Sequence, residues 1–341
     1  MTEVGPDWRS GLPDVIRGCW QLSEDHGSGW TEASAHRALT EAAERGELVL
    51  DMGDIYTGVE ALVGGWLRTR PDGAARVRIH TKCVPDLDAL ASLDRDLVRR
   101  TVHRSLRRLG VDSLDLVQLH WWDFSVPGWT DAAEWLCELE EEGDVRAVGV
   151  TNFDAPRLAT LLDGGLRIVS NQVQFSLLDR RPASSLAPLC AERGVALLCY
   201  GTLAGGLLTE SWRRQPWPPQ VPVSRSLAKY RVVVDEVGGW AALQQLLDAV
   251  ASVAGETGRS FAEVCGAYVR HQRSVASVVL GLSRGRAHAW PKALAALSPE
   301  HIRTLEAALP NPITGVVYEA ERDMDGAHGK LMRYDLGSGP E

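Results

Sequence analysis

The feature that most constrains this chain is a repeated alternation of short apolar runs with segments of helical periodicity. Strands buried on both faces of a parallel sheet have this near-continuous apolar character. Eight such units predict a protein of the α/β class, folded as a closed (β/α)8 TIM barrel. The eight runs are VIRGCW, ELVLDMG, RVRIHTK, LDLVQLH, VRAVGVTN, RIVSNQVQF, VALLCYG and SVASVVLG.

Turn residues flank the helical segments. Thr31 and Asp154 are expected to cap helix N-termini, and Gly110 and Gly194 to end helices. An open doubly wound sheet is the alternative architecture. It is disfavoured because no GxGxxG motif follows the first apolar run.

Two segments depart from a simple barrel. Residues 202–257 are too many for an ordinary strand-to-helix connection, and they include the proline-rich run RRQPWPPQVP. We expect an extended loop there, which is a candidate lid, with a helix over residues 240–254. Residues 310–341 form a C-terminal extension. The whole chain, 1–341, is otherwise expected to be a single barrel domain.

Composition excludes several classes of protein. The net charge of −9 argues against a nucleic-acid surface, and no apolar run approaches the roughly 18 residues of a membrane span. The polar N-terminus does not resemble a signal peptide, so we expect a cytoplasmic protein. The six cysteines are scattered without a CxxC pair, and no metal-ligand spacing is present.

Polar side chains follow the apolar runs at the ends where TIM barrels place their active sites. Asp51 follows the second run with Tyr56 close behind, Lys82 ends the third, and His120 ends the fourth. Each alone could be an ordinary core or surface residue, and Asp54 is interpreted as turn chemistry. Further polar residues end the next three runs, namely Thr151, Asn152, Asn171, Gln172 and Tyr200.

This combination favours proton transfer to a carbonyl oxygen. A free tyrosine has a pKa near 10, which a neighbouring ammonium lowers. We therefore expect Lys82 to lower the pKa of Tyr56, Asp51 to hold Lys82, and His120 to hydrogen-bond the carbonyl or relay a proton. Such a site needs a partner that delivers hydride.

Six motifs in barrel order resemble the aldo-keto reductase superfamily, and the chain is identified as a bacterial member. They are DMGDIYTGVEALVGGWLR, IHTK, LDLVQLHWWD, VRAVGVTNFD, SNQVQFSLLDRRP and LLCYGTLAGGLLT. The family pattern is D-x-A-x-x-Y, and Gly53 replaces its alanine. The resemblance implies Tyr56 as the proton donor, with Asp51, Lys82 and His120 completing a catalytic tetrad.

The resemblance also implies a nicotinamide cofactor, NADP(H) in preference to NAD(H). Thr151, Asn152 and Gln172 would hold its carboxamide, and Tyr200 would stack on its ring. The Q-x-x-E-N pattern that usually accompanies the 2′-phosphate is absent, which keeps NAD(H) open. Positions implied for the pyrophosphate and adenosine end are Gly201, Leu203, Gly206, Gly281, Ser283, Arg284 and Arg286.

The substrate is expected to be a small carbonyl compound in an aromatic pocket lined by Trp20 and Trp121. A ketone of secondary metabolism, such as a polyketide side chain, is the hypothesis, with a simple sugar or aldehyde as its competitor. Two other classes stay open. One is a cofactor-binding regulatory subunit, and the other is a barrel enzyme without net redox chemistry. The sequence leaves open whether the chain forms homo-oligomers.

Overall fold

Eight parallel strands close into a barrel in chain order, with β1 paired to both β2 and β8. This computed structural model describes residues 8–9, 11–26, 29–44, 46, 48–70, 76–216, 224–282 and 293–332. The predicted (β/α)8 fold is therefore confirmed. The strands are β1 Val15–Gly18, β2 Leu48–Asp51, β3 Val77–Cys83, β4 Leu116–His120, β5 Val148–Thr151, β6 Ile168–Gln174, β7 Ala196–Tyr200 and β8 Val275–Gly281.

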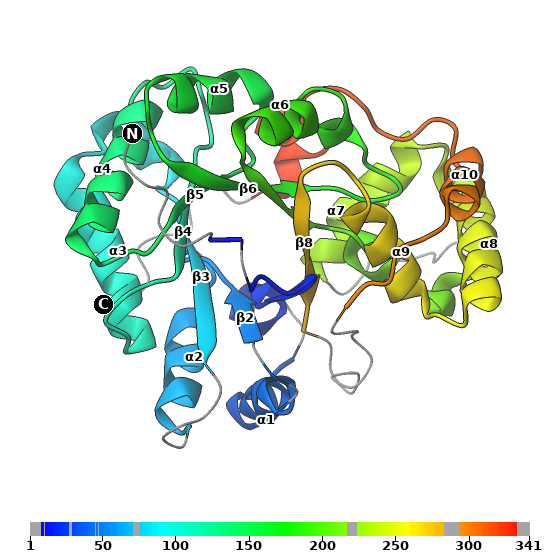
Figure 1. Cartoon of the computed structure of the whole chain (residues 1–341), viewed down its shortest axis with the longest axis horizontal. Helices are drawn as coiled ribbons and strands as arrows, with labels where there is room; N and C mark the ends of the chain where they lie inside the picture. The colour runs from blue at the N-terminus through cyan, green and yellow to red at the C-terminus, as the bar shows by residue number, and fades with distance from the viewer. Residues whose placement is uncertain are drawn as a thin grey trace.

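Helices surround the strands, as Figure 1 shows. Thr31, Asp94 and Asp154 cap three of them, each accepting a hydrogen bond from a backbone N–H of the first turn. The helices of the described residues are α1 Glu32–Ala43, α2 Val59–Arg68, α3 Arg95–Leu109, α4 Trp129–Glu142, α5 Ala155–Asp163, α6 Leu186–Arg193, α7 Arg225–Glu236, α8 Gly239–Thr257, α9 Phe261–Arg270, α10 Pro299–Ala307 and α11 Glu319–Arg322.

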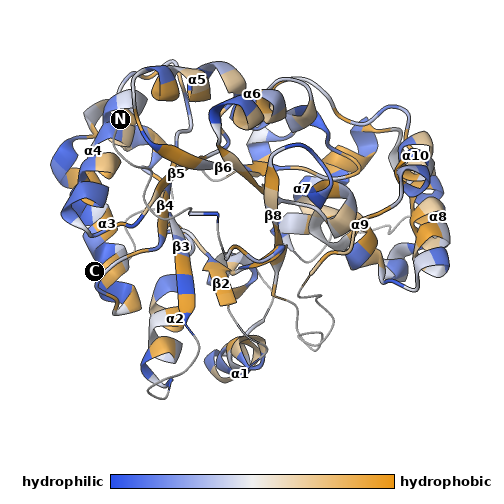
Figure 2. Ribbon diagram, viewed as in Figure 1, coloured by the Kyte–Doolittle hydropathy of each residue, from blue (hydrophilic) through white to orange (hydrophobic). Residues whose placement is uncertain are grey.

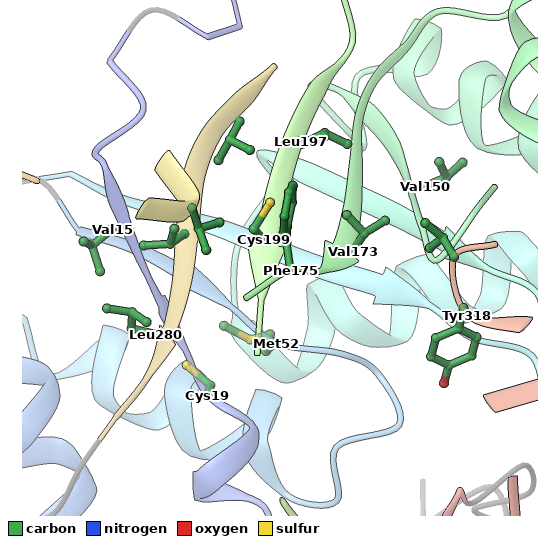
Figure 3. Close-up of a cluster of buried hydrophobic side chains, with 14 of the residues drawn as sticks. Val15, Cys19, Met52, Val150, Val173, Phe175, Leu197, Cys199, Leu280 and Tyr318 are labelled. Atoms are coloured by element: carbon green, nitrogen blue, oxygen red, sulfur yellow. The ribbon is translucent and has the colours of Figure 1, made fainter. Parts of the chain in front are cut away.

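The core has two parts. A large apolar cluster fills the space between the strands and the helices, and Figure 3 shows neighbouring members such as Val173, Leu197 and Cys199. A smaller cluster includes Ile16 and Leu116 near the start of their strands and packs against Trp8 of the N-terminal segment. Hydrophobic residues predominate along most strands, whereas the helices mix hydrophobic and hydrophilic residues (Figure 2).

The connection from β7 to β8 is more regular than the sequence analysis predicts. It contains the expected helix α8 and also α7, which the analysis leaves in an irregular stretch. The side chain of Ser224 accepts a hydrogen bond from the backbone N–H of Leu227 and caps α7. Helix α8 packs against α7, α9 and α10 on one side of the barrel (Figure 1).

The C-terminal extension follows the barrel surface back to the active-site end. It is tied to the barrel by a backbone hydrogen bond from the Arg180 N–H to the Ile313 carbonyl, 2.8 Å long. Tyr318 of this segment joins the buried cluster, and it is labelled in Figure 3. Across the described ranges, no helix combines the length and apolar character needed to cross a membrane.

Candidate active site

A cavity of about 1120 Å³ opens at the C-terminal ends of the strands. Pockets for one small ligand are roughly 300–1,000 Å³, so this cavity exceeds the usual size. All eight strands contribute a lining residue at or near their last position, as in other TIM barrels. These residues are Gly18, Asp51, Lys82, His120, Thr151, Gln172, Tyr200 and Gly281.

Asp51 and Lys82 form a buried ion pair in the wall of this cavity. The Lys82 Nζ donates to Asp51 Oδ1 at 2.6 Å and to the Met52 carbonyl at 2.7 Å. The other Asp51 oxygen accepts from the side-chain amides of Gln118 at 3.0 Å and Gln172 at 2.6 Å. Burial disfavours the ammonium, but Asp51 and Tyr56 outweigh it, and the pKa of Lys82 is raised. The lysine therefore remains charged.

Tyr56 lies beside this pair at the start of the segment leading to α2. The Lys82 ammonium hydrogen-bonds the Tyr56 side chain and lies 5.2 Å from its ring centroid. Lys82 acts on the pKa of Tyr56 in the expected direction, but the net pKa is raised. Burial raises the pKa of Tyr56 by more than the charge of Lys82 lowers it. The phenol consequently stays protonated, which suits an acid.

His120 faces the same cavity as a neutral ring. Burial, reinforced by the charge of Arg322, lowers the pKa of His120 to about 3. Its Nδ1 lies 3.4 Å from the Thr151 carbonyl, and its buried Nε2 has no hydrogen-bond partner among the described residues. The rings of Trp122 and Tyr318 contact it edge-on, at 4.2 Å and 5.4 Å between centroids. The site therefore offers one unsatisfied nitrogen to a ligand.

The residues implied for the carboxamide lie together on the cavity wall. The Thr151 hydroxyl donates to the Gln172 carbonyl at 2.9 Å, and the Tyr200 hydroxyl donates to Asn152 Oδ1 at 2.9 Å. Asn152 has a left-handed backbone, with φ of 62°, which asparagine adopts more readily than most residues. The Gln172 side-chain amide is engaged with Asp51, so this residue also supports the ion pair.

The positions implied for the pyrophosphate line the same cavity, including Leu203 and Gly281. Gly201 has φ of 73°, and a Cβ there would lie 2.2 Å from the Tyr230 hydroxyl, so only glycine fits. Gly206 has φ of 101°, and no atom lies within 4 Å of the position that a Cβ would occupy, so a ligand can approach its backbone closely. Ser283, Arg284 and Arg286 lie outside the described residues.

Four basic residues of the β7–β8 connection line the cavity and are not among the candidates predicted from the sequence: Arg213, Arg225, Lys229 and Arg259. Among the described residues of this connection, the one acidic side chain that lines the cavity is Glu210. Arg213 pairs with Asp248 and Lys229 lies 3.8 Å from Glu321, so carboxylates compensate part of this positive charge. The cavity wall is nevertheless richer in basic than in acidic groups on this side, although the chain carries a net charge of −9. Polyanionic ligands prefer such a surface. Lys229 and Arg225 were not recognised because α7 itself was not predicted.

The aromatic wall differs from the prediction at one position. Trp20 lines the cavity with its ring centroid 4.9 Å from that of Tyr56, as expected. The prediction for Trp121 is wrong, because this side chain is fully buried away from the cavity. Its indole N–H donates to the backbone carbonyls of Asp123 and Val126. Trp122 lines the cavity instead. Periodicity cannot distinguish two adjacent tryptophans beyond a strand end.

Asp54 lies in a turn, as interpreted, but it is almost fully buried. Its Oδ2 lies 3.5 Å from the Arg104 guanidinium, while its Oδ1 has no partner among the described residues. Burial and the nearby charge of Glu60 raise the pKa of Asp54 to about 8. No group of three or more His, Cys, Asp or Glu side chains suited to a metal ion occurs in the described part of the chain.

Comparison with known proteins finds similarity to one protein family over most of the chain. The model of the Aldo/keto reductase family matches residues 14–309. The Protein tas of Escherichia coli is 30% identical over 291 residues, covering 74% of this chain and 81% of that protein. The NADH-specific methylglyoxal reductase of Escherichia coli is 34% identical over 176 residues. That match covers 47% of this chain and about half, 52%, of the reductase.

A solved structure resembles the chain over nearly its whole length. An aldo-keto reductase from Bacillus halodurans, in its holo form, has a TM-score of 0.67 and 26% sequence identity. The likeness covers 91% of this chain and 95% of that one. The chain therefore shares its overall fold with this aldo-keto reductase.

Proposed function

The chain belongs to the aldo/keto reductase family, and from this premise we propose that it reduces the carbonyl group of a small ketone or aldehyde with NADPH. Membership makes it an NAD(P)H-dependent oxidoreductase that acts on carbonyl groups. One observation carries the catalytic proposal. Tyr56, the Asp51–Lys82 pair and the unpartnered Nε2 of His120 line the same cavity.

The described residues fit a nicotinamide dinucleotide. The basic side chains of the β7–β8 connection suit its phosphates, and the open backbone at Gly206 suits close contact with the pyrophosphate. Thr151, Asn152 and Gln172 would hold the carboxamide, and Tyr200 would contact the ring. We propose NADP(H) as the cofactor, and one relative's printed specificity for NADH makes NAD(H) the alternative to test.

The four catalytic residues have distinct roles in this proposal. When bound, the cofactor supplies hydride to the carbonyl carbon. Tyr56 donates its phenolic proton to the carbonyl oxygen, and the Lys82 ammonium stabilises the phenolate that forms. Asp51 keeps Lys82 charged and oriented. Because the Thr151 carbonyl can only accept, its contact with Nδ1 places the proton of the neutral ring on Nδ1. His120 therefore presents its unpartnered Nε2 to the site as an acceptor that can relay a proton.

The reductive direction is supported by the protonation of Tyr56. Because burial raises its pKa, the free enzyme holds the phenol protonated at neutral pH and is ready to donate. Oxidation of an alcohol would start from the phenolate, which Lys82 alone must stabilise against burial. We therefore propose that carbonyl reduction is the favoured direction.

The substrate side supports an uncharged carbonyl compound. Trp20, Trp30 and Trp122 line the cavity together with Tyr318, and flat apolar groups pack well on such rings. A ketone of secondary metabolism, such as a polyketide side chain, remains our substrate proposal. Methylglyoxal, named for one relative, is a convenient small probe.

The β7–β8 segment and the free cysteines support two further proposals, on cofactor coverage and on the cellular compartment. We propose that segment 202–257 covers the bound cofactor, because Leu203, Gly206 and Lys229 from this segment line the cavity. We also propose a reducing compartment such as the cytoplasm, because the six cysteines are free thiols.

A carbonyl screen tests the function. Purified protein is mixed with NADPH or NADH and with methylglyoxal, aryl ketones or sugar aldehydes, and nicotinamide absorbance is followed. Oxidation of NADPH or NADH that requires both the protein and the carbonyl compound supports the proposal. If the protein binds the dinucleotide but no carbonyl compound causes its oxidation, a regulatory subunit is favoured. If a substrate is converted without oxidation of NADPH or NADH, a non-redox enzyme is favoured.

A further inference from the structure

The C-terminal extension reaches the active site through a buried ionic anchor. Glu321 is fully buried in α11, and its carboxylate accepts two hydrogen bonds from Arg181, at 2.8 and 2.9 Å. The same guanidinium donates to Asp179 at 2.7 Å. Buried ion pairs of this geometry define one arrangement, because a displaced partner would leave an uncompensated charge. The anchor therefore fixes the position of the next residue, Arg322.

Arg322 contacts the loops that follow β4 and β5. Its Nη2 donates to the Asn152 carbonyl at 2.7 Å and approaches the Trp121 carbonyl at 3.4 Å. The guanidinium also lies over the rings of Phe124, at 4.4 Å, and Tyr318, at 5.1 Å. A planar fork with several donors suits this combination of stacking and hydrogen bonding, whereas a lysine would supply only a point charge.

Asn152 is held from three directions. Its backbone N–H donates to the Gln172 carbonyl at 2.9 Å, and its side-chain oxygen accepts from the Tyr200 hydroxyl at 2.9 Å. The third contact is the hydrogen bond from Arg322 to its carbonyl. Because Asn152 has a left-handed backbone with φ of 62°, its side-chain direction depends on the peptide that Arg322 holds.

We propose that Arg322 is a positioning residue for the cofactor: from the C-terminal extension it holds the Asn152 peptide so that the Asn152 amide can bind the nicotinamide carboxamide. This inference rests on the proposed function. It assigns a role in the nicotinamide end of the site to a residue 170 positions away along the chain. The same side chain contributes to the neutral state of His120, through its positive charge.

The test compares two ligands that differ only in the part that Asn152 would contact. One is NADPH, and the other is 2′-phospho-ADP-ribose, which lacks the nicotinamide. Calorimetric titration measures both affinities for the wild type and for Arg322→Gln and Arg322→Lys. Lys330→Gln is the matched control, because it removes the same charge from an exposed position of the extension.

We expect Arg322→Gln to weaken NADPH binding roughly tenfold to a hundredfold, in line with the loss of one charge-assisted hydrogen bond. Binding of 2′-phospho-ADP-ribose should be unchanged, Arg322→Lys should be intermediate, and Lys330→Gln should match the wild type. Equal weakening of both ligands, or unchanged NADPH affinity, would overturn the inference. If Arg322→Gln does not fold, Arg322→Lys decides by the same comparison. A wild type that binds neither ligand would overturn the proposed function, and the inference with it.

Discussion

Removing the charge of Glu321 tests how firmly the C-terminal extension is docked on the barrel. Burial opposes the charge of this carboxylate, but hydrogen bonds from Arg181 and the charge of Lys229 lower its pKa from 4.5 to about 2. Glu321→Gln removes the charge and leaves Arg181 and Lys229 with less compensation in a buried setting. We expect a less stable protein with a loosened extension.

The magnitude follows from that pKa. A shift from 4.5 to about 2 corresponds to about 3 kcal/mol of unfolding free energy at pH 7, at roughly 1.4 kcal/mol per unit. Removing one partner of a buried ion pair typically costs about 3–5 kcal/mol, which agrees. Because the folded-state pKa lies below the unfolded value, this stability is complete well above pH 4.5 and is lost as pH falls through about 2.

Urea unfolding of wild type, Glu321→Gln and Glu319→Gln measures this effect. Glu319 is exposed on the same helix, so its variant should stay within about 0.5 kcal/mol of the wild type. The deficit of Glu321→Gln should be about 3 kcal/mol at pH 7 and smaller near pH 3. A deficit below about 0.5 kcal/mol at pH 7, or one that does not shrink in acid, would show that the charge of Glu321 does not stabilise the protein.

Three further predictions address the site and its surroundings. Trp122→Ala should alter KM for bulky ketones, whereas Trp121→Ala should instead cost about 3–5 kcal/mol of stability in urea unfolding; the reverse pattern would contradict the assignment. The value of kcat/KM should not change with pH from about pH 5 to about pH 9, because the pKa of His120 is about 3 and that of Tyr56 is raised above 10. A rise or fall of kcat/KM near pH 7 would argue against these assignments. Asp54→Asn should raise the unfolding free energy at pH 8. The wild-type carboxyl has a pKa near 3.8 in the unfolded chain and about 8 in the folded protein, so the wild type loses stability as the pH rises from about 4 to 8. The gain should vanish toward pH 4, and equal stability at pH 8 would exclude the effect.

Much of the fold could be predicted because the relevant signals are local. Apolar runs of β-branched residues, caps such as Thr31 and Asp154, and stops such as Gly110 are decided by neighbours within a few residues. Helix α7 was missed because it follows a proline-rich segment. Its only local start signal, the Ser224 cap, is weak without a tertiary partner.

In the site, too, the residues with a local sequence signal could be predicted and those that depend on distant contacts could not. Asp51, Lys82 and His120 could be predicted because each ends a strand, and strand ends meet at one rim of a barrel. The net pKa of Tyr56 could not be predicted, because it depends on how deeply the surrounding wall buries the phenol. The role of Arg322 carries no local signal, because its hydrogen bonds to the Trp121 and Asn152 carbonyls join residues that lie far apart in the sequence.

We propose Tyr56 as the proton donor of an NADPH-dependent carbonyl reduction. The most direct measurement compares wild type and Tyr56→Phe for NADPH affinity and for NADPH oxidation with a carbonyl substrate from the screen. We expect equal NADPH affinity and a loss of turnover of about 10²–10⁴-fold, the range for removal of a general acid. Turnover of Tyr56→Phe close to that of the wild type would contradict the claim.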